Sequence, residues 1–329
     1  MAIDNQKVAA VVVTFNRKNL LIECLDALLS QTYKLTSIII IDNASTDGTY
    51  DTLKEKGYLD KGIIDYVRLN ENIGGAGGFY EGIKRGYEKG YDWLWIMDDD
   101  AEPKNDALEK LVIYGDKLSV KALVSGIYNK RDLSLQKRVY ESVIKNDKLY
   151  KNYNHEKNDF ITNDYIKICS YPLLGLFIHK DVIKNCGNVR KEFFIQCDDL
   201  EYTLRISDLY EIVWVRDSVL FHKESEDFFI TRKFLGRDFS FLNVKQQWKD
   251  YYGFRNHIIV SKMRFGKEFR ISKYIKDYIK RVIKIILIED FKLYRLHIYT
   301  KALFDGINNK SGKRIIPGYV PFMRSGVLK

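Results

Sequence analysis

The chain has few cysteines, and they are scattered through its 329 residues: Cys24, Cys169, Cys186 and Cys197. They form no CxxC pair and accompany no paired histidine pattern, which argues against a zinc site and favours free thiols in a reducing compartment. No apolar stretch approaches the ~20 residues that cross a bilayer. The first residues run into a predicted strand without the apolar core of a signal peptide, so the sequence predicts a cytoplasmic protein.

Two common nucleotide-binding signatures are also absent. No GKS or GKT occurs, which excludes a P-loop. A dinucleotide-binding fingerprint places its glycines directly after the first strand, but residues 14–19 contain none. The glycines come later, at 72–78, and do not match GxGxxG. A dehydrogenase with Asp42 on a ribose is therefore a weak alternative.

The pattern of the first hundred residues predicts an α/β fold. Buried strands are expected near residues 8–14, 37–42, 63–69 and 93–97, and helical segments alternate with them. This alternation is typical of a mostly parallel sheet flanked by helices, as in a Rossmann-like nucleotide-binding unit. The length suits one large α/β domain with an appended region.

Three consecutive carboxylates, Asp98, Asp99 and Asp100, end the fourth apolar run, and a helix is expected from Pro103. Ligands of open α/β sheets bind at this edge, where strands end. Adjacent carboxylates repel one another, and Mg²⁺ or Mn²⁺ shared with substrate phosphates would relieve that repulsion. The alternative is a solvated acidic turn or a set of charges at a helix N-terminus.

A second acidic group follows an apolar run at residues 193–197. Asp198, Asp199 and Glu201 open a predicted helix there. One acid suffices to cap a helix, and this segment offers three within four positions. Capping remains the alternative to a catalytic role.

Several segments together resemble a known family. Residues 11–17 (VVVTFNR), residues 41–48 (IDNASTDG) and the Asp-Asp-Asp triplet resemble the inverting glycosyltransferases of family 2, which have the GT-A fold. Residues 72–79 and 93–100 are most similar to its galactofuranosyltransferase and rhamnosyltransferase branch.

The resemblance implies a donor site for a nucleotide sugar. Thr14 and Arg17 would contact the nucleotide, Asp42 would accept the imide N–H of uracil or thymine, and Asp99 would face the donor sugar or ribose. The backbone of the glycine-rich segment would approach the diphosphate. That segment provides Asn72, Gly74, Gly75, Gly77 and Gly78. Asp42 as a turn cap and the glycines as a flexible turn are the alternatives.

The same resemblance implies a metal and a base. Asp98 and Asp100 would bind the cation with His222 as third ligand, and an imidazole favours Mn²⁺ over Mg²⁺. A lone histidine is otherwise more often structural. Asp199 would be the general base, with Asp198 as the alternate, and Glu201 would bind the acceptor or support the site.

The C-terminal third is basic and aromatic. Residues 262–301 hold twelve Lys or Arg and four Asp or Glu. Residues 271–286 predict a basic amphipathic helix, which would either pack in a bundle with a solvated lysine face or lie on an anionic membrane leaflet. No nucleic-acid-binding motif accompanies it. In the aromatic segment 248–256, core packing is expected, and Arg255 is a weak candidate for a phosphate contact.

The sequence therefore predicts a catalytic domain at residues 1–235 and a helical domain for acceptor or membrane contact at residues 236–329. The expected activity is metal-dependent transfer of a sugar, UDP-galactofuranose being the preferred donor and dTDP-rhamnose the second, to a lipid-linked surface glycan. Such an enzyme would be peripheral on the inner face of the plasma membrane. The alternative from another class is a non-catalytic scaffold that binds membrane or nucleic acid. Acceptor, linkage and oligomeric state stay open.

Overall fold

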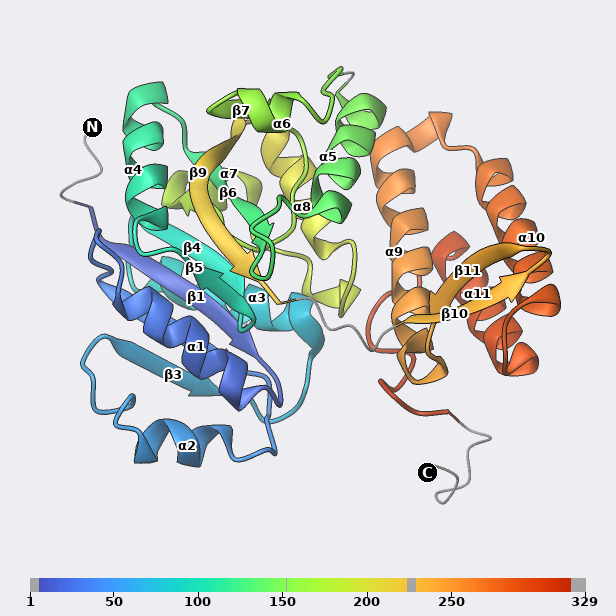
Figure 1. Cartoon of the computed structure of the whole chain (residues 1–329), viewed down its shortest axis with the longest axis horizontal. Coiled ribbons are helices and arrows are strands. Elements are labelled where there is room, and N and C mark those ends of the chain that lie inside the picture. Colours follow the sequence, from blue (N-terminus) through green and yellow to red (C-terminus); the bar gives the residue numbers. More distant parts are fainter. Residues whose placement is uncertain (1–5, 152, 224–228, 321–329) are drawn as a thin grey trace. The chain divides into compact units, whose positions relative to one another are not determined.

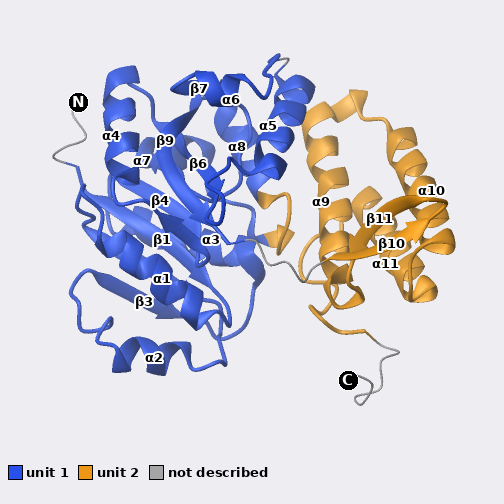
Figure 2. Cartoon of the chain, in the orientation of Figure 1, with its two compact units in different colours: residues 1–191, 199–224 blue, residues 192–198, 225–329 orange. Residues whose placement is uncertain are grey.

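The computed structural model describes residues 6–151, 153–223 and 229–320. The chain divides into two compact units (Figure 2). Unit 1 holds residues 1–191 and 199–224, and unit 2 holds residues 192–198 and 225–329. Unit 2 therefore includes a short segment directly before Asp199, far in sequence from the rest of that unit.

The first half of unit 1 is the parallel α/β unit that the sequence predicts (Figure 1). Its elements are β1 (Val8–Thr14), α1 (Lys18–Leu29), β2 (Ser37–Asp42), α2 (Thr49–Glu55), β3 (Ile64–Arg68), α3 (Gly74–Glu88) and β4 (Trp93–Asp98). The strands lie in the order β3-β2-β1-β4 and all run parallel. Both β1 and β2 are buried along their whole length, which explains their apolar sequences. All four strands end at one edge, so the loops that follow them come together.

The sheet continues with strands of mixed direction. The remaining elements of this part are β5 (Ala101–Pro103), α4 (Ala107–Leu118), β6 (Ala122–Asn129), α5 (Lys137–Tyr150), α6 (Asp159–Thr162), β7 (Tyr165–Ile168), β8 (Leu176–His179), α7 (Lys180–Cys186), a 3-10 turn (Lys191–Phe193), α8 (Asp198–Ser207) and β9 (Ile212–His222). Within the described ranges, nine strands form one sheet in the order β3-β2-β1-β4-β8-β6-β9-β5, with β7 paired to β9. β8 runs antiparallel to β4, and β5 and β7 run antiparallel to β9.

Two local expectations are wrong. Pro103 does not begin a helix but ends β5, and α4 starts at Ala107. The polar residues 119–165, which predict a hairpin and loops, instead contain β6, α5 and α6. Six of the eight residues of β6 are buried between β8 and β9, and this burial stabilises the strand although the sequence around it is rich in lysine.

The glycine-rich segment forms the start of α3 and not a loop. Its predicted donor-binding glycines all lie in that helix: Gly74, Gly75, Gly77 and Gly78. A Cβ atom on Gly78 would lie 2.5 Å from Cγ1 of Val13, so α3 packs on β1 at a distance that only glycine permits. A Cβ atom on Gly75 would meet nothing within 4 Å.

These two glycines give a matched test of the packing. Gly78→Ala should lower the free energy of unfolding by about 1–3 kcal/mol, because the added methyl overpacks the contact with Val13. Gly75→Ala should be neutral or stabilise by up to about 1 kcal/mol, because alanine favours helix. Urea unfolding measures both. Equal effects of the two substitutions would contradict this packing role for Gly78.

Unit 2 is helical, as predicted, but it also contains a hairpin that the sequence pattern did not indicate. Its elements are β10 (Phe229–Phe234), β11 (Arg237–Leu242), a 3-10 turn (Val244–Gln246), α9 (Gln247–Phe265), a second 3-10 turn (Gly266–Glu268), α10 (Ile271–Leu287) and α11 (Lys292–Ile307). Leu235 and Gly236 form the hairpin turn with positive φ at both positions, which matches the twist of paired strands. The predicted domain boundary after residue 235 falls inside this turn.

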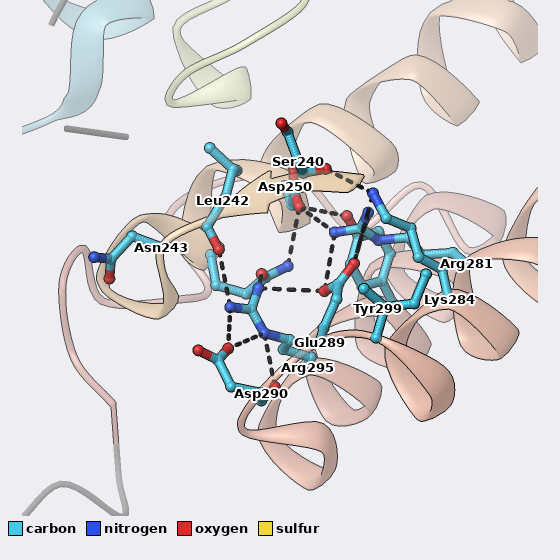
Figure 3. Close-up of polar contacts among 12 residues, drawn as sticks. Ser240, Leu242, Asn243, Asp250, Arg281, Lys284, Glu289, Asp290, Arg295 and Tyr299 are labelled. Atoms are coloured by element: carbon cyan, nitrogen blue, oxygen red, sulfur yellow. Dashed lines mark hydrogen bonds and ion pairs between the residues drawn. The ribbon is translucent and has the colours of Figure 1, made fainter. Parts of the chain in front are cut away.

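A buried network of charges connects the elements of unit 2 (Figure 3). Arg295 of α11 has no exposed side-chain surface; it donates to the backbone oxygen of Leu242 in β11 (2.9 Å) and pairs with Glu289 (3.4 Å). Arg281 of α10 pairs with the same Glu289 (3.0 Å) and with Asp250 of α9 (3.1 Å). Burial raises the pKa of Glu289, and the nearby arginines oppose that rise. Removing one member would leave an uncompensated buried charge, so the network fixes how these elements pack.

The network also changes which residues form the basic face of α10. Arg281 and Lys284, which the sequence places on that face, are half-buried, and Lys284 donates to the backbone oxygen of Ser240 (2.8 Å). Three lysines of α10 stay exposed: Lys273, Lys276 and Lys280.

Candidate active site

The loops that follow β1, β2 and β3 are joined by hydrogen bonds through Asn43. Its backbone N–H donates to the oxygen of Thr14 (2.9 Å), and its side-chain amide donates to the oxygen of Gly74 (2.8 Å). The Asn43 Oδ1 atom accepts from the backbone N–H of Ile73 (2.9 Å). Asn72, which the resemblance places at the donor, accepts from the N–H of Gly74 (2.8 Å) and helps to start α3. Asn43 is buried. It belongs to the segment 41–48 that resembles the family and directly follows a strand end, and these are the two signals that could single it out.

Asp42 is buried at the end of β2, and both of its carboxylate oxygens have partners. Oδ1 accepts from the N–H of Ser45 (2.7 Å), and Oδ2 accepts from the hydroxyl of Tyr66. Burial and the bond to Asp42 raise the pKa of Tyr66, which keeps this hydroxyl protonated. The ring of Tyr50, 43% exposed, lies 5.7 Å from that of Tyr66. An aromatic surface therefore lies beside Asp42, whose contact with a base stays a prediction.

Thr14, Arg17, Asp99 and Asp100 meet at the ends of β1 and β4. Thr14 Oγ1 donates to Asp99 Oδ2 (2.7 Å). Arg17 Nη1 donates to Asp99 Oδ1 (3.2 Å) and to Asp100 Oδ2 (2.8 Å). Burial raises the pKa of Asp99 to about 6, although the charge of Arg17 opposes the rise. One guanidinium thus offsets the repulsion between two neighbouring carboxylates.

His222, the last residue of β9, lies beside Asp100. The antiparallel register of β5 and β9 pairs it with Ala101, and its Nε2 atom lies 3.4 Å from Asp100 Oδ1. Gln136, buried at the start of α5, donates to the backbone oxygen of His222 (3.2 Å) and places Oε1 3.3 Å from His222 Nδ1. Burial alone would raise the pKa of Asp100, but the neighbouring His222 side chain and the charge of Arg17 lower it. No motif or periodic pattern in the sequence singles out Gln136.

Asp100 and His222 suit a divalent cation. Asp100 Oδ1 is buried and has no hydrogen-bond partner within the described part of the chain. A proton on His222 Nδ1, shared with Gln136 Oε1, leaves Nε2 free to act as a ligand atom. Two ligands of one octahedral cation lie about 3 Å apart when each is ~2.1 Å from it. The 3.4 Å separation between Oδ1 and Nε2 is close to that geometry.

Asp98 does not join this pair. Among residues 6–151, 153–223 and 229–320, no group of three or more His, Cys, Asp and Glu side chains is arranged to hold a metal ion. Asp98 is the last residue of β4, and the chain turns at Asp99 and Asp100, so strand alternation does not place Asp98 and Asp100 on one face. Substrate oxygens and water would complete the coordination, as is usual for Mg²⁺ and related ions.

The second acidic group opens α8, as predicted. Asp198 is buried and is the first residue of the helix. Asp199 is partly buried, and its Oδ1 atom accepts from the N–H of Leu200 (2.7 Å). Burial raises the pKa of Asp199, and the positive charge of Arg138 in α5 opposes the rise. A carboxylate with a raised pKa is suited to take a proton near neutral pH.

Of the two roles predicted for Glu201, support of the site and contact with an acceptor, its contacts fit the first. Its side chain is buried and accepts from Arg190 Nε (3.0 Å), Arg205 Nε (3.0 Å) and Arg205 Nη2 (2.7 Å). Arg205 lies one turn later on α8 and also donates to the backbone oxygen of Asn188 (3.0 Å). Both Glu201 oxygens are therefore engaged in holding α8.

A cavity of about 560 Å³ lies at the N-terminal half of α5. Its lining is polar and includes three basic residues and one acidic one: Asn129, Gln136, Lys137, Arg138, Glu141, Ser142 and Lys145. Gln136 orients His222, and the charge of Arg138 acts on Asp199. The start of α5 therefore serves both the Asp100–His222 pair and the predicted base.

The family model described as Glycosyl transferase family 2 matches residues 9–175, half of the chain. The chain belongs to glycosyl transferase family 2. The match includes the acidic triplet, while Asp199 and His222 lie beyond it.

Two relatives come from the predicted branch. The chain is 36% identical to the galactofuranosyltransferase GlfT1 of Mycolicibacterium smegmatis over 96 residues, 29% of this chain and 30% of that protein. It is 26% identical to the dTDP-rhamnosyl transferase RfbF of Shigella flexneri over 202 residues, 61% of this chain and 63% of that protein. Each match spans less than two thirds of the relative.

Solved structures confirm the predicted GT-A-like fold. Residues 1–349 of S. aureus TarS in complex with UDP-GlcNAc match with a TM-score of 0.57 at 12% identity, covering 92% of this chain and 81% of that one. The mannosyltransferase PcManGT of Pyrobaculum calidifontis, in complex with GDP-Man and Mn²⁺, matches with a TM-score of 0.54 at 16% identity, covering 92% and 75%. At such identities the likeness concerns the fold alone.

Proposed function

We propose that this protein catalyses metal-dependent, inverting transfer of a sugar from a nucleotide sugar to a hydroxyl of a growing, lipid-linked surface glycan. One observation carries the proposal, namely the cluster of polar and charged side chains around Asp99 and Asp100 at the carboxyl edge of the parallel sheet. The cluster consists of Thr14, Arg17, Asp99, Asp100 and His222. Nucleotide ligands of open α/β sheets bind at this edge.

UDP-galactofuranose is the preferred donor, and dTDP-rhamnose is the second candidate. The similarity to GlfT1 supports the first and the similarity to RfbF supports the second. Uracil and thymine both present an imide N–H, for which buried Asp42 at the end of β2 is a suitable acceptor. The exposed ring of Tyr50 offers either base an aromatic surface.

The reaction needs a group that takes the proton of the acceptor hydroxyl. As the acceptor oxygen bonds to the anomeric carbon, the bond from that carbon to the diphosphate oxygen breaks, and its electron pair leaves with the nucleoside diphosphate. Asp199 receives the hydroxyl proton. Burial, which raises the pKa of Asp199, supports this role. Asp198, its buried neighbour, is the alternate base.

Asp100 and His222 would hold the cation, and the imidazole favours Mn²⁺ over Mg²⁺. A bound cation offsets the negative charge that develops on the leaving diphosphate. Gln136 keeps the His222 ring oriented, and Arg17 holds Asp99 and Asp100 in place. Asp98 stays a predicted further ligand, although no group of three such side chains gathers at a metal site within the described residues.

The base assignment predicts different effects for two neighbouring aspartates. Asp199→Asn should lower kcat by about 10²–10⁴-fold, because the amide cannot take the proton. Asp198→Asn should lower kcat by less than about tenfold, because Asp199 would still act as the general base. Donor turnover with an acceptor glycan gives the rates, and nucleotide binding should persist in both variants. If Asp198→Asn lowers kcat more than Asp199→Asn, Asp198 is the base. If both variants keep near-normal rates, neither aspartate is the base.

The cation proposal predicts a joint effect of nucleotide and metal. UDP with Mn²⁺ at about 100 times the dissociation constant should stabilise the protein by about 2.7 kcal/mol, a rise of roughly 2–4 °C in Tm. Asp100→Ala and His222→Ala should each abolish the rise that depends on Mn²⁺. His297→Ala, which alters an exposed histidine of α11, is the control and should keep it. A scaffold without catalytic function would show no such rise in the unaltered protein.

A peripheral contact with an anionic lipid surface completes the proposal. No helix among the described residues is long and apolar enough to span a membrane. Ile275, Ile279 and Ile283 of α10 follow one another at four-residue steps and are 42%, 50% and 51% exposed. The exposed lysines of α10 flank this stripe, which suits a leaflet of anionic lipid.

Vesicle co-sedimentation tests this contact. The double change Ile279→Glu and Ile283→Glu should weaken binding to vesicles with anionic lipid by at least about tenfold, because two apolar side chains would no longer leave water. Ile113→Glu, at a 47% exposed isoleucine of α4, is the matched control and should bind normally. Unchanged binding by the double variant, or equal binding to neutral vesicles, would contradict the proposal.

A further inference from the structure

The residues directly before α8 follow an unusual backbone path. Phe194, Gln196 and Cys197 have φ angles of 67°, 69° and 61°. These angles lie in the left-handed region, which residues other than glycine rarely adopt. Three such residues within four positions persist only where surrounding contacts hold them. The next two residues are Asp198 and Asp199, so the path of this segment determines where both carboxylates begin.

Asn256 of α9 binds three backbone oxygens of this segment. Its fully buried amide nitrogen donates to Phe193 (3.0 Å), Ile195 (2.9 Å) and Gln196 (2.8 Å). An amide has two N–H groups, so at least one of them is shared between two oxygens. Asn256 Oδ1 accepts from Arg255 Nε (2.8 Å), which fixes the orientation of the amide.

Arg255 adds a fourth contact to the segment. Its Nη2 donates to the oxygen of Phe193 (3.0 Å) and its Nη1 to the oxygen of Gly312 (2.7 Å). The guanidinium lies over the ring of Tyr252, 4.8 Å from its centre, and that ring packs against Phe194. Arg255 is fully buried, so it is not the phosphate contact that the sequence suggested. Its donors satisfy backbone oxygens inside unit 2.

We propose that Arg255 and Asn256 form a clamp that positions the catalytic base. The clamp holds residues 193–196 in the left-handed path from which α8 and Asp199 follow. It acts through the backbone and does not touch the substrate, so both are positioning residues. This inference rests on the proposed role of Asp199. Without the clamp, the oxygens of Phe193, Ile195 and Gln196 lose buried donors, and the segment relaxes toward ordinary φ angles.

The test combines hydrogen exchange with kinetics on the full chain. Asn256→Ala should speed amide exchange in residues 193–199 by about tenfold, because the segment opens locally more often. It should lower kcat by roughly 10–100-fold, because small displacements of a catalytic group are costly. The donor KM and the stabilisation by UDP with Mn²⁺ should stay within about twofold, since donor contacts lie in residues 14–100 and at His222.

Two further variants separate positioning from folding. Ser261→Ala removes a buried hydrogen bond between Tyr274 and α9 without touching residues 193–199, and should leave kcat unchanged. Arg255→Lys keeps a cation near Tyr252 but loses the forked donors. If Asn256→Ala does not fold, Arg255→Lys takes its place in the test. Arg255→Lys should then speed amide exchange in residues 193–199 and lower kcat.

Unchanged exchange or unchanged kcat in a folded clamp variant overturns the inference. If Ser261→Ala lowers kcat as much as the clamp variants do, the inference is also overturned, because the loss would then come from general destabilisation. Asp199→Asn distinguishes the two levels of the argument. If it keeps its rate, the proposed base is wrong, and exchange still reports whether the clamp holds the segment. If it is inactive and the clamp variants are not, only the clamp inference fails.

Discussion

The site depends on holding neighbouring carboxylates together at the end of a buried strand. Two like charges 4 Å apart cost about 4 kcal/mol at an effective dielectric constant of 20. Arg17 offsets this repulsion with one nitrogen on both Asp99 and Asp100, and His222 approaches Asp100 from the opposite strand. Arg17 follows β1 and His222 ends β9, so the turn after β4 receives side chains from two other strands of the sheet.

The sequence predicts the part of this arrangement that follows from the parallel strands. Continuous apolar runs identify β1, β2 and β4, because strands buried on both faces leave no polar alternation. Parallel strands that end at one edge bring their following loops together without any knowledge of side-chain contacts. The family resemblance, and not the topology alone, singles out Thr14, Arg17 and Asp99, and the structure joins them by direct hydrogen bonds.

Contacts between distant segments were not predictable in the same way. The position of His222 depends on the antiparallel register of β5 with β9. The position of Gln136 depends on how α5 packs against β9. Neither the register nor the packing produces a periodic pattern in the sequence. The glycines of α3 looked like a loop because the sequence does not reveal how closely a helix will approach β1. Arg281 and Lys284 looked like surface charges because their buried partners lie elsewhere in the chain.

The proposed donor contacts and the proposed base have separate structural supports. The contacts of Thr14, Arg17 and Asp42 lie within unit 1, inside the region that matches the family. The segment before Asp199 belongs to unit 2, although Asp199 itself belongs to unit 1. Residues 194–197 are directly followed by α8, so their backbone path sets where the helix with the proposed base begins. Substitutions at Arg255 and Asn256 are therefore expected to alter the geometry of the proposed base, because the proposed donor contacts lie in unit 1, away from the hydrogen bonds that these two residues make.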